Sequence, residues 1–520
     1  MANQNSTQLN AKRINISSTY TLDQYKNDIK MHGMNNVWHE ILLYLSKSHN
    51  KCGIITPDNI GELYEIGLAC LNKEYKKKHG VYYTPIDVAC VMSKWFLNLD
   101  GTNVCDVCCG VGNLIITYLN TIGVDKAKEL LNAGRVYLYE QDELALQICK
   151  ERICMIYGYE YLPKINCIVG DFLDRNIKLP NNCKIISNPP YFKLKEIPQT
   201  WEQTQVVKEN KEIYAIIMEK IIKNSVSSVI ITPYSFMGGE KFFTLREQMN
   251  DYNGFIVSFD NVPGNIFCGQ KHGIFNTNLS NSVRASITVV ENKKDKHGFR
   301  CSNLIRFKNT ERSILLNTDI LEHFIGNKYQ IINSLNKKYA KCNPELESIF
   351  DLLIKSSNTT LSNLIDKNGK YALCIPNTCR YYSVASLKDL SRTGKYTISF
   401  KTEKERDLVY CLINSSFCYW YWRLYDGGIT YSRSLLMTMP IFISKMTDTQ
   451  INKLLHIAKQ MQLVEPNYLT YKKNAGKMQE NIKFPPKYRE EINNILLNAI
   501  GSKYQSDIFD IVHSNTANSF

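Results

Sequence analysis

The amino-acid sequence predicts an α/β fold: a doubly wound sheet of seven strands, preceded by a helical segment and followed by a mixed α/β region. Between residues 81 and about 292, short β-rich runs alternate with helical patterns, as is typical of a parallel sheet. The first of these runs ends in a glycine turn that leads into an apolar helix. Hydrophobic residues make up 44% of the 520 residues, which excludes a mostly disordered chain.

The pattern divides the chain into three parts, at 1–78, 79–295 and 296–520. The first part is predicted to be helical, because its runs VWHEILLYLSK and IGELYEIGLACLNKEY place apolar residues at helical spacing. The polar stretch NKKDKHGFR is predicted to be the linker to the last part. The seven predicted strands are VCDVCC, RVYLYE, INCIVGD, KIISNPP, SVIITP, GFIVSFD and RASITVVE.

The charge balance permits a polyanionic partner without identifying it. There are 63 Lys and Arg against 49 Asp and Glu, a formal net charge of +14. No run approaches the ~20 apolar residues of a membrane span, so we expect no membrane contact. The first residues, MANQNSTQLNAKRIN, lack the apolar core of a signal peptide. We therefore expect a cytoplasmic protein whose 17 cysteines are reduced thiols.

The run VCDVCCGVGNLI predicts a nucleotide site at the carboxyl edge of the sheet. It brings Asp106 to the end of a strand, and Gly110 and Gly112 allow a tight turn that approaches a ligand. Glu140 ends the next strand and can accept both hydroxyls of a ribose. Asp171 follows the third strand, within reach of the exocyclic amine of an adenine ring. A generic nucleotide site is the alternative, but the third glycine of the NAD fingerprint is missing.

Cys105 and Cys108 have the Cys-x-x-Cys spacing of some metal sites. No second pair or nearby histidine pair completes four ligands, and Cys105 is predicted to lie within the strand. We therefore expect no metal.

The run KIISNPPYFK predicts a site for a planar amine. Two prolines fix φ and remove two backbone donors, which leaves a rigid turn at Pro189 and Pro190 whose carbonyls point outward. These carbonyls and the side-chain oxygen of Asn188 can accept hydrogen bonds from an amine and free its lone pair for attack. Tyr191 offers a flat face on which a base can stack. A structural turn at the end of a strand is the alternative.

Together these motifs resemble the γ-class S-adenosylmethionine-dependent adenine-N6 DNA methyltransferases of restriction–modification systems. The resemblance covers about 81–292, with the motifs in γ order. GVYYTPIDVACVM is similar to the segment that precedes the glycine-rich strand, and DVCCGVGNLI to DPxCGxGxFL, although Val107 replaces a proline. The fold implied is a Rossmann-like methyltransferase domain followed by a target-recognition domain.

The resemblance implies double-stranded DNA as substrate, with adenine flipped out of the stack, and S-adenosylmethionine as cofactor. Tyr191 and Phe267 would contact the target base, although the motif around Phe267 carries an insertion. A cognate restriction endonuclease is the further partner. The cofactor contacts implied are Tyr82, Tyr83, Thr84, Asp106, Cys108, Gly110, Gly112, Glu140, Gln141, Asp171, Phe172 and Asn188.

Other methyltransferases with a similar turn stay open as alternatives. The modification subunit of a multisubunit restriction system is the nearest of them, although such subunits usually carry NPPF and a longer helical lead. Enzymes that methylate a glutamine amide or ribosomal RNA are usually shorter. Cytosine-N4 enzymes usually have serine at the position of Asn188, and cytosine-C5 chemistry needs a cysteine nucleophile that is absent from this turn.

Five segments are candidates for DNA contact or for the recognition core. Residues 192–212 form a long polar stretch that we expect to overhang the site. Basic residues alternate with tyrosines at 380–396, 429–433 and 483–489, a mixture suited to phosphate and base contact. The aromatic stretch 411–428 is predicted to be a core helix that ends at Gly427 and Gly428.

Overall fold

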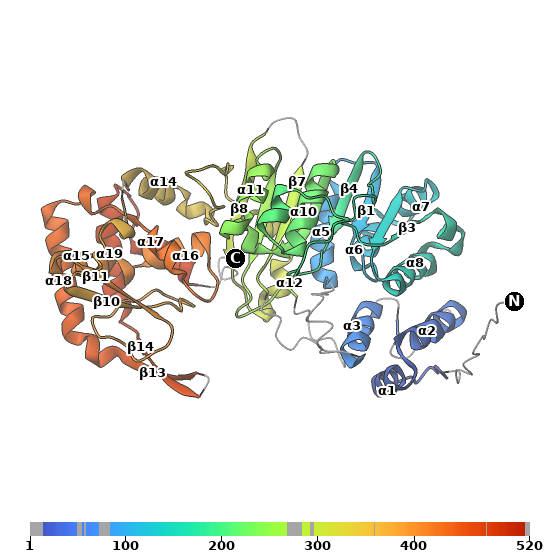
Figure 1. Ribbon diagram of the computed structural model, residues 1–520, viewed down its shortest axis with the longest axis horizontal. Coiled ribbons are helices and arrows are strands. Elements are labelled where there is room, and N and C mark those ends of the chain that lie inside the picture. Colours follow the sequence, from blue (N-terminus) through green and yellow to red (C-terminus); the bar gives the residue numbers. More distant parts are fainter. Residues whose placement is uncertain are drawn as a thin grey trace.

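The computed structural model describes residues 14–48, 55–56, 59–71, 84–267, 283–291, 296–357, 359–474 and 476–514. The N-terminal helices, the central sheet and the C-terminal region follow one another along the long axis of the molecule (Figure 1). None of the helices in these ranges is both long and apolar enough to cross a membrane.

The N-terminal part is helical, as predicted. It consists of α1 (Leu22–His32), α2 (Met34–Ser48) and α3 (Ile60–Leu71). A capping box at Thr21 starts α1. Trp38 is fully buried between Tyr25 and Tyr64, so aromatic packing joins the three helices into one small core.

The central domain is a sheet of eight strands in the order β3-β2-β1-β4-β5-β7-β6-β8. Strands β1 to β5 run parallel, whereas β7 is antiparallel to both of its neighbours. The strands are β1 Asn103–Val107, β2 Val136–Glu140, β3 Asn166–Val169, β4 Cys183–Ser187, β5 Ser227–Pro233, β6 Asn253–Phe259, β7 Ala285–Glu291 and β8 Gly298–Ile305.

The predicted count of seven strands was wrong. All seven predicted strands are present, but β8 adds an eighth by pairing in parallel with β6. It begins inside the stretch predicted to be the linker, and it extends the sheet past the predicted boundary at residue 295. The sequence did not indicate this strand, because a polar, charged stretch leads into it. The strand itself is almost wholly buried by tertiary packing.

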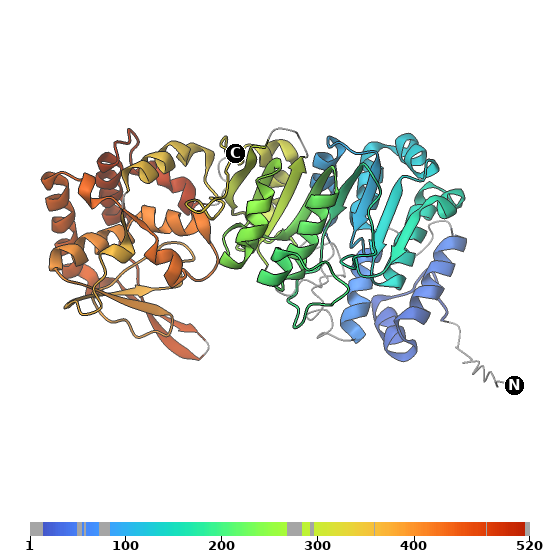
Figure 2. The ribbon, with the colours of Figure 1, turned by 45° about the horizontal axis from the view of Figure 1, so that its top comes forward.

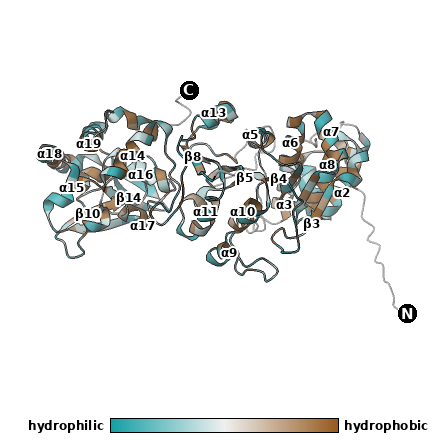
Figure 3. Cartoon of the chain, turned by 90° about the horizontal axis from the view of Figure 1, so that it is seen from above, coloured by the Kyte–Doolittle hydropathy of each residue, from teal (hydrophilic) through white to brown (hydrophobic). Residues whose placement is uncertain are grey.

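Helices cover both faces of the sheet, as a doubly wound fold requires (Figures 1 and 2). The residues of α5, α6 and α8 form a core with one face, and those of α10 and α11 form a second core with the other. Figure 3 shows hydrophobic residues on α6, α8 and α10. The bounds are α5 Ile86–Leu97, α6 Asn113–Ile122, α7 Val124–Asn132, α8 Glu143–Tyr157, α9 Gln205–Glu209, α10 Ile213–Asn224 and α11 Phe243–Met249.

The C-terminal region has a core of its own, built from helices and three small two-stranded sheets. The sheets pair β10 with β11, β12 (Pro440–Ile441) with β9 (Thr359–Thr360), and β13 with β14. The principal elements are α14 Glu347–Ser356, β10 Tyr371–Pro376, β11 Lys395–Phe400, α15 Glu403–Ile413, α16 Ser416–Tyr425, α18 Asp448–Val464, β13 Leu469–Asn474, β14 Lys477–Ile482 and α19 Pro486–Ala499.

The aromatic stretch 411–428 is buried core, as predicted, but it is not one helix. It ends α15 and forms α16, because Ser415 takes an extended conformation as the N-cap of α16. Trp420 and Trp422 of α16 are both almost completely buried, each with 1% of its surface exposed.

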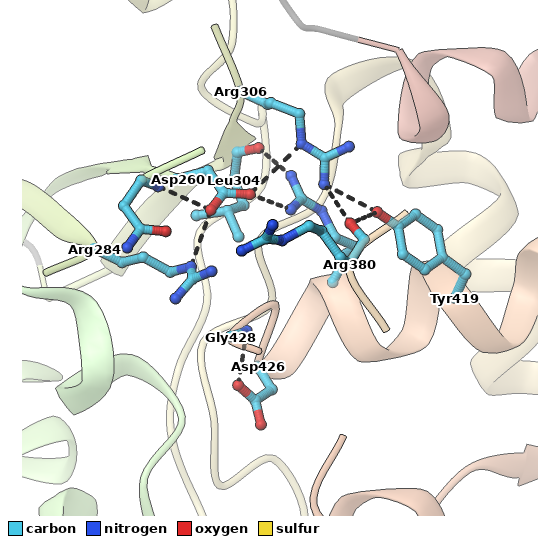
Figure 4. A network of polar contacts seen from close by, with 10 residues as sticks. Asp260, Arg284, Leu304, Arg306, Arg380, Tyr419, Asp426 and Gly428 are labelled. Carbon is cyan, nitrogen blue, oxygen red and sulfur yellow. Dashed lines mark hydrogen bonds and ion pairs between the residues drawn. The ribbon is translucent and has the colours of Figure 1, made fainter. Parts of the chain in front are cut away.

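One buried carboxylate joins the sheet to the C-terminal region (Figure 4). Asp260, which follows β6, accepts hydrogen bonds from Arg284 Nε at 2.9 Å and from Arg423 Nη1 of α16 at 2.7 Å. Arg306 Nε, just after β8, lies 3.6 Å from the same carboxylate. Burial alone would raise the pKa of Asp260, but the attraction of these three arginines lowers it below its ordinary value.

Replacing Asp260 by alanine is expected to lower the free energy of unfolding by about 3 to 5 kcal/mol, because it leaves buried arginine charges without a counter-ion. Urea denaturation followed by tryptophan fluorescence measures the change. The control is Asp251→Ala, which removes an ion pair to Lys296 whose two side chains are 64% exposed. It should cost less than about 1 kcal/mol, and equal effects of the two substitutions would contradict the account.

Candidate active site

The carboxyl ends of the parallel strands surround a cavity of about 550 Å³. It lies where the strand order reverses, between β1 and β4, which is where open α/β sheets bind ligands. The residues that follow β1, β2, β3 and β4 all contribute to its wall. The segments that the sequence singled out are therefore brought together around one space.

The glycine-rich turn has the backbone geometry that the sequence predicted. Cys108, Gly110 and Gly112 have positive φ angles of 60°, 53° and 89°, and α6 begins directly afterwards. A Cβ atom on Gly112 would lie 2.4 Å from Cys149 Sγ, so this close approach requires glycine. Cys105 is buried within β1, as predicted.

Asp106 presents a buried carboxylate oxygen toward this turn. Its side chain is fully buried, and Oδ2 accepts a hydrogen bond from the backbone N–H of Ile115 at 3.1 Å. Oδ1 has no hydrogen-bond partner among the described residues. Burial raises the pKa of Asp106 well above its usual value, and the charge of Glu140 raises it further. An orphaned anionic oxygen of this kind is suited to a cationic donor.

Glu140 is held at the end of β2 by backbone donors. Its Oε2 accepts from Gly110 N at 2.9 Å, and its Oε1 accepts from Gln141 N at 2.9 Å and Asp142 N at 3.0 Å. Burial raises its pKa, although these N–H groups oppose the shift. Oε2 keeps acceptor capacity for a hydroxyl group, whereas Oε1 already accepts two hydrogen bonds.

Asp171 and Phe172 both line the cavity, as predicted. The sequence did not predict that Trp201 Nε1 donates to Asp171 Oδ2 at 2.6 Å. Trp201 belongs to the segment 192–212, which an isolated bridge to Asp174 draws across the end of β3. Part of the segment that we expected to overhang the site is therefore buried, since Trp201 is only 3% exposed.

Asn188 is fixed from both sides directly after β4. Its Nδ2 donates to Thr84 Oγ1 at 3.0 Å, and its Oδ1 accepts from the hydroxyl of Tyr191 at 2.6 Å. The same hydroxyl lies 2.9 Å from the carbonyl oxygen of Ile231. Asn188, Thr84 and Pro190 line the cavity, whereas Pro189 is buried beneath it.

The ring of Tyr191 packs edge-on against Phe267, with ring centroids 5.8 Å apart, and against Tyr214. The cavity wall contains the next residue, Phe192, instead of Tyr191. Phe267 is only 4% exposed. Contact of Tyr191 and Phe267 with a base therefore stays a prediction.

The remaining predicted contacts divide into two groups. Cys108 and Gln141 line the cavity. Burial raises the pKa of the Cys108 thiol, and the charges of Glu140, Asp106 and Asp171 raise it further. Tyr82 and Tyr83 lie outside the described residues.

The sequence missed the contribution of the N-terminal helices. Tyr64 and Leu68 of α3 form part of the cavity wall, and the hydroxyl of Tyr64 donates to the carboxylate of Asp142. Asp142 also caps α8 through the N–H groups of Leu144 and Ala145. A tyrosine on an amphipathic helix has no local signal that separates a cavity wall from a packing contact.

The cavity is acidic. Glu140, Asp142, Glu143 and Asp171 line it, and within the described ranges no lysine or arginine does. Asp106 is fully buried and is not one of the lining residues. This set of acceptors fits a ligand that carries positive charge and hydroxyl groups, and the glycine turn leaves room for its close approach.

The chain belongs to the N-6 DNA Methylase family. The model of this family matches residues 55–317, about half of the chain, and includes every strand and turn of the site. The predicted class, adenine-N6 DNA methyltransferases of restriction–modification systems, is thereby confirmed.

Among curated proteins, the chain is similar to the type II methyltransferase M.VspI of Vibrio sp. (strain 343). The two are 22% identical over 333 residues, which cover 59% of this chain and 76% of M.VspI. Among solved structures, similarity extends to the EcoKI M protein of a type I restriction enzyme, at 13% identity, 56% and 61% coverage and a TM-score of 0.34. The chain in a DrdV–DNA complex shows 11% identity, 85% and 64% coverage and a TM-score of 0.46. The chain thus covers less than two thirds of these two solved chains.

The raised pKa of Asp106 predicts an unusual pH dependence. Above its raised folded-state pKa, the charged Asp106 destabilises the folded protein, by about 1.4 kcal/mol per unit of elevation. As the pH falls below that value towards the unfolded-state pKa, the folded state takes up a proton and this cost declines to zero. Asp106→Asn should therefore melt higher than the wild type at pH near 8, with a difference that shrinks as the pH falls. Thermal melts without ligand test this, and a difference independent of pH would contradict it.

Proposed function

We propose that this protein transfers a methyl group from S-adenosylmethionine to N6 of a flipped-out adenine in double-stranded DNA, as the modification enzyme of a system that includes a cognate restriction endonuclease. The observation that carries the proposal is the meeting of Glu140, Asp171 and Asn188 around one acidic cavity, with Asp106 buried near the end of β1. The cavity has acceptors for both a cationic nucleoside and a planar amine.

The donor set fits S-adenosylmethionine. The α-amino group of its methionine part would be held by the orphaned Oδ1 of Asp106, and its ribose hydroxyls by Glu140. Its adenine would lie near Asp171 and Phe172, with Tyr64 closing the wall. The cofactor supplies a methyl group on a sulfonium centre, which is a good leaving group.

Asn188 holds the target amine. Because Thr84 Oγ1 accepts from its Nδ2, the amide is oriented with Oδ1 turned away from Thr84 and available as an acceptor. The hydroxyl of Tyr191 now donates to that oxygen, but it has a second acceptor in the carbonyl oxygen of Ile231 at 2.9 Å. A base amine can therefore take the place of Tyr191 at Asn188 while the phenol keeps a partner.

The reaction needs alignment and no strong base. A duplex adenine must leave the stack to reach the cavity. Hydrogen bonds from its N6 to Asn188 and to the carbonyl of Pro189 release the nitrogen lone pair, which forms the new bond to the methyl carbon. The bond between this carbon and sulfur breaks, with its electron pair left on sulfur. N6 then carries a positive charge and loses a proton to water. Correct placement of the two reactants supplies most of the acceleration.

Asn188→Ala is expected to lower methyl transfer by at least about 100-fold, comparable with the loss of one oriented hydrogen-bonding group in other active sites. Transfer of labelled methyl groups to plasmid DNA measures the rate, and calorimetry should show S-adenosylmethionine affinity within a few-fold of the wild type. The matched control, Asn452→Ala on the exposed surface of α18, should leave both unchanged. Full activity of Asn188→Ala would refute the proposed mechanism.

Tyr64→Phe is expected to weaken S-adenosylmethionine binding by about tenfold, because it removes a hydrogen bond to a carboxylate at the cavity wall. Calorimetry on the purified protein measures the Kd. Tyr20→Phe is the matched control, since its hydroxyl donates to Asp28 at 2.8 Å in the same N-terminal segment but away from the cavity. If both variants bind like the wild type, α3 has no part in cofactor binding.

A further inference from the structure

A two-stranded hairpin projects from the C-terminal region. Strands β13 and β14 pair in antiparallel register from Leu469↔Ile482 to Asn474↔Lys477, with Gly476 in the turn at φ +81°. The hairpin extends away from the body of that region (Figure 1). Near its tip the described side chains are exposed on both faces of the ribbon, so this part of the hairpin adds nothing to a hydrophobic core.

The tip carries positive charge and exposed apolar surface. Residues 470–479 include Lys472, Lys473 and Lys477 and contain no aspartate or glutamate. In the part of the chain that the structure describes, none of these lysines forms an ion pair. Tyr471 is 61% exposed and Met478 is 57% exposed.

The base of the hairpin, by contrast, is held firmly. Glu480 accepts from Ser391 N at 2.7 Å and from Lys388 Nζ at 2.8 Å, and Thr393 N donates to Gln479 Oε1 at 3.0 Å. Below it, Ile482 is fully buried in a small core. The ribbon is thus presented in a fixed direction.

The predicted basic cluster 380–396 is partly occupied by internal contacts. In 380–396, Lys388 pairs with Glu480, and Lys395 pairs with Asp389. Tyr431 of 429–433 and Tyr488 of 483–489 are buried, at 1% and 6% exposure. The cluster 380–396 therefore supports the hairpin, whereas Lys472, Lys473 and Lys477 at the tip form no ion pair among the described residues.

The hairpin lies on the same side of the molecule as the active-site cavity. In Figures 1 and 2 it projects downward, and α3, which contributes Tyr64 to the cavity wall, also lies on the lower side.

We propose that the β13–β14 hairpin contacts the groove and flanking phosphates of the DNA duplex. This proposal rests on the proposed function. A two-stranded ribbon, with strands about 4.8 Å apart, fits the major groove, which is about 12 Å wide. Six residues per strand extend about 20 Å, enough to cross it. By the strand register, Tyr471, Lys473 and Met478 share one face of the ribbon, which would meet the groove. Lys472 and Lys477 lie on the opposite face, from which their long side chains would reach the flanking phosphates.

The test replaces the three tip lysines by glutamine. Binding to a pool of short duplexes of random sequence, measured by fluorescence anisotropy between about 50 and 200 mM salt, should weaken about tenfold or more for the triple variant. The slope of log K against log salt should fall in magnitude by up to about 2.7, since each lost phosphate contact contributes about 0.9. The affinity for S-adenosylmethionine and the melting temperature should not change.

The matched control also loses three lysine charges, through Lys126→Gln and Lys128→Gln on α7 and Lys453→Gln on α18. It should bind DNA much as the wild type does. If the wild type binds and methylates DNA and the tip variant equals the control in affinity and salt slope, the hairpin proposal alone is overturned. If the wild type binds no duplex at all, the proposed function fails, and the hairpin proposal fails with it.

Discussion

The reversal of strand order between β1 and β4 is the constraint on which the site depends. Because β1, β2, β3 and β4 run parallel, their carboxyl ends open at one edge, and the reversal separates the connections there. Asp106 and Asn188 thereby come from two neighbouring strands that are far apart in the sequence. In the proposed function, the cofactor and the target base share one cavity because the parallel strands end at this common edge.

Around that edge, hydrogen bonds fix the polar groups, but some of these groups can still accept further hydrogen bonds. Asp106 keeps an orphaned buried oxygen, at a cost in stability that a cationic ligand can offset. Tyr191 has two acceptors for its single hydrogen, so Asn188 can be released without leaving the phenol unpaired. Far from the cavity, Asp260 is instead surrounded by arginines and fixes the C-terminal region to the sheet. The first arrangement prepares binding, and the second provides a rigid frame.

Local patterns in the sequence were sufficient for the central strands, the glycine turn and the placement of Asp106, Glu140 and Asn188. They were insufficient wherever a long-range contact decides the outcome. The strand β8 follows a charged stretch and is defined by pairing with β6. Tyr64 and Trp201 reach the site from helix and loop segments whose patterns match ordinary packing. The hairpin lysines were not predicted as DNA contacts, because the sequence alone does not show which lysines of a basic segment form ion pairs.

The central claim is that the cavity accepts adenine and that methylation occurs at N6. Single-molecule sequencing of DNA from a host that expresses the protein tests this most directly, because it identifies the modified base together with its sequence context. The account predicts N6-methyladenine confined to one short sequence context and absent from the same host without the protein. Methylated cytosine at that context, or DNA with no added modification, would contradict it.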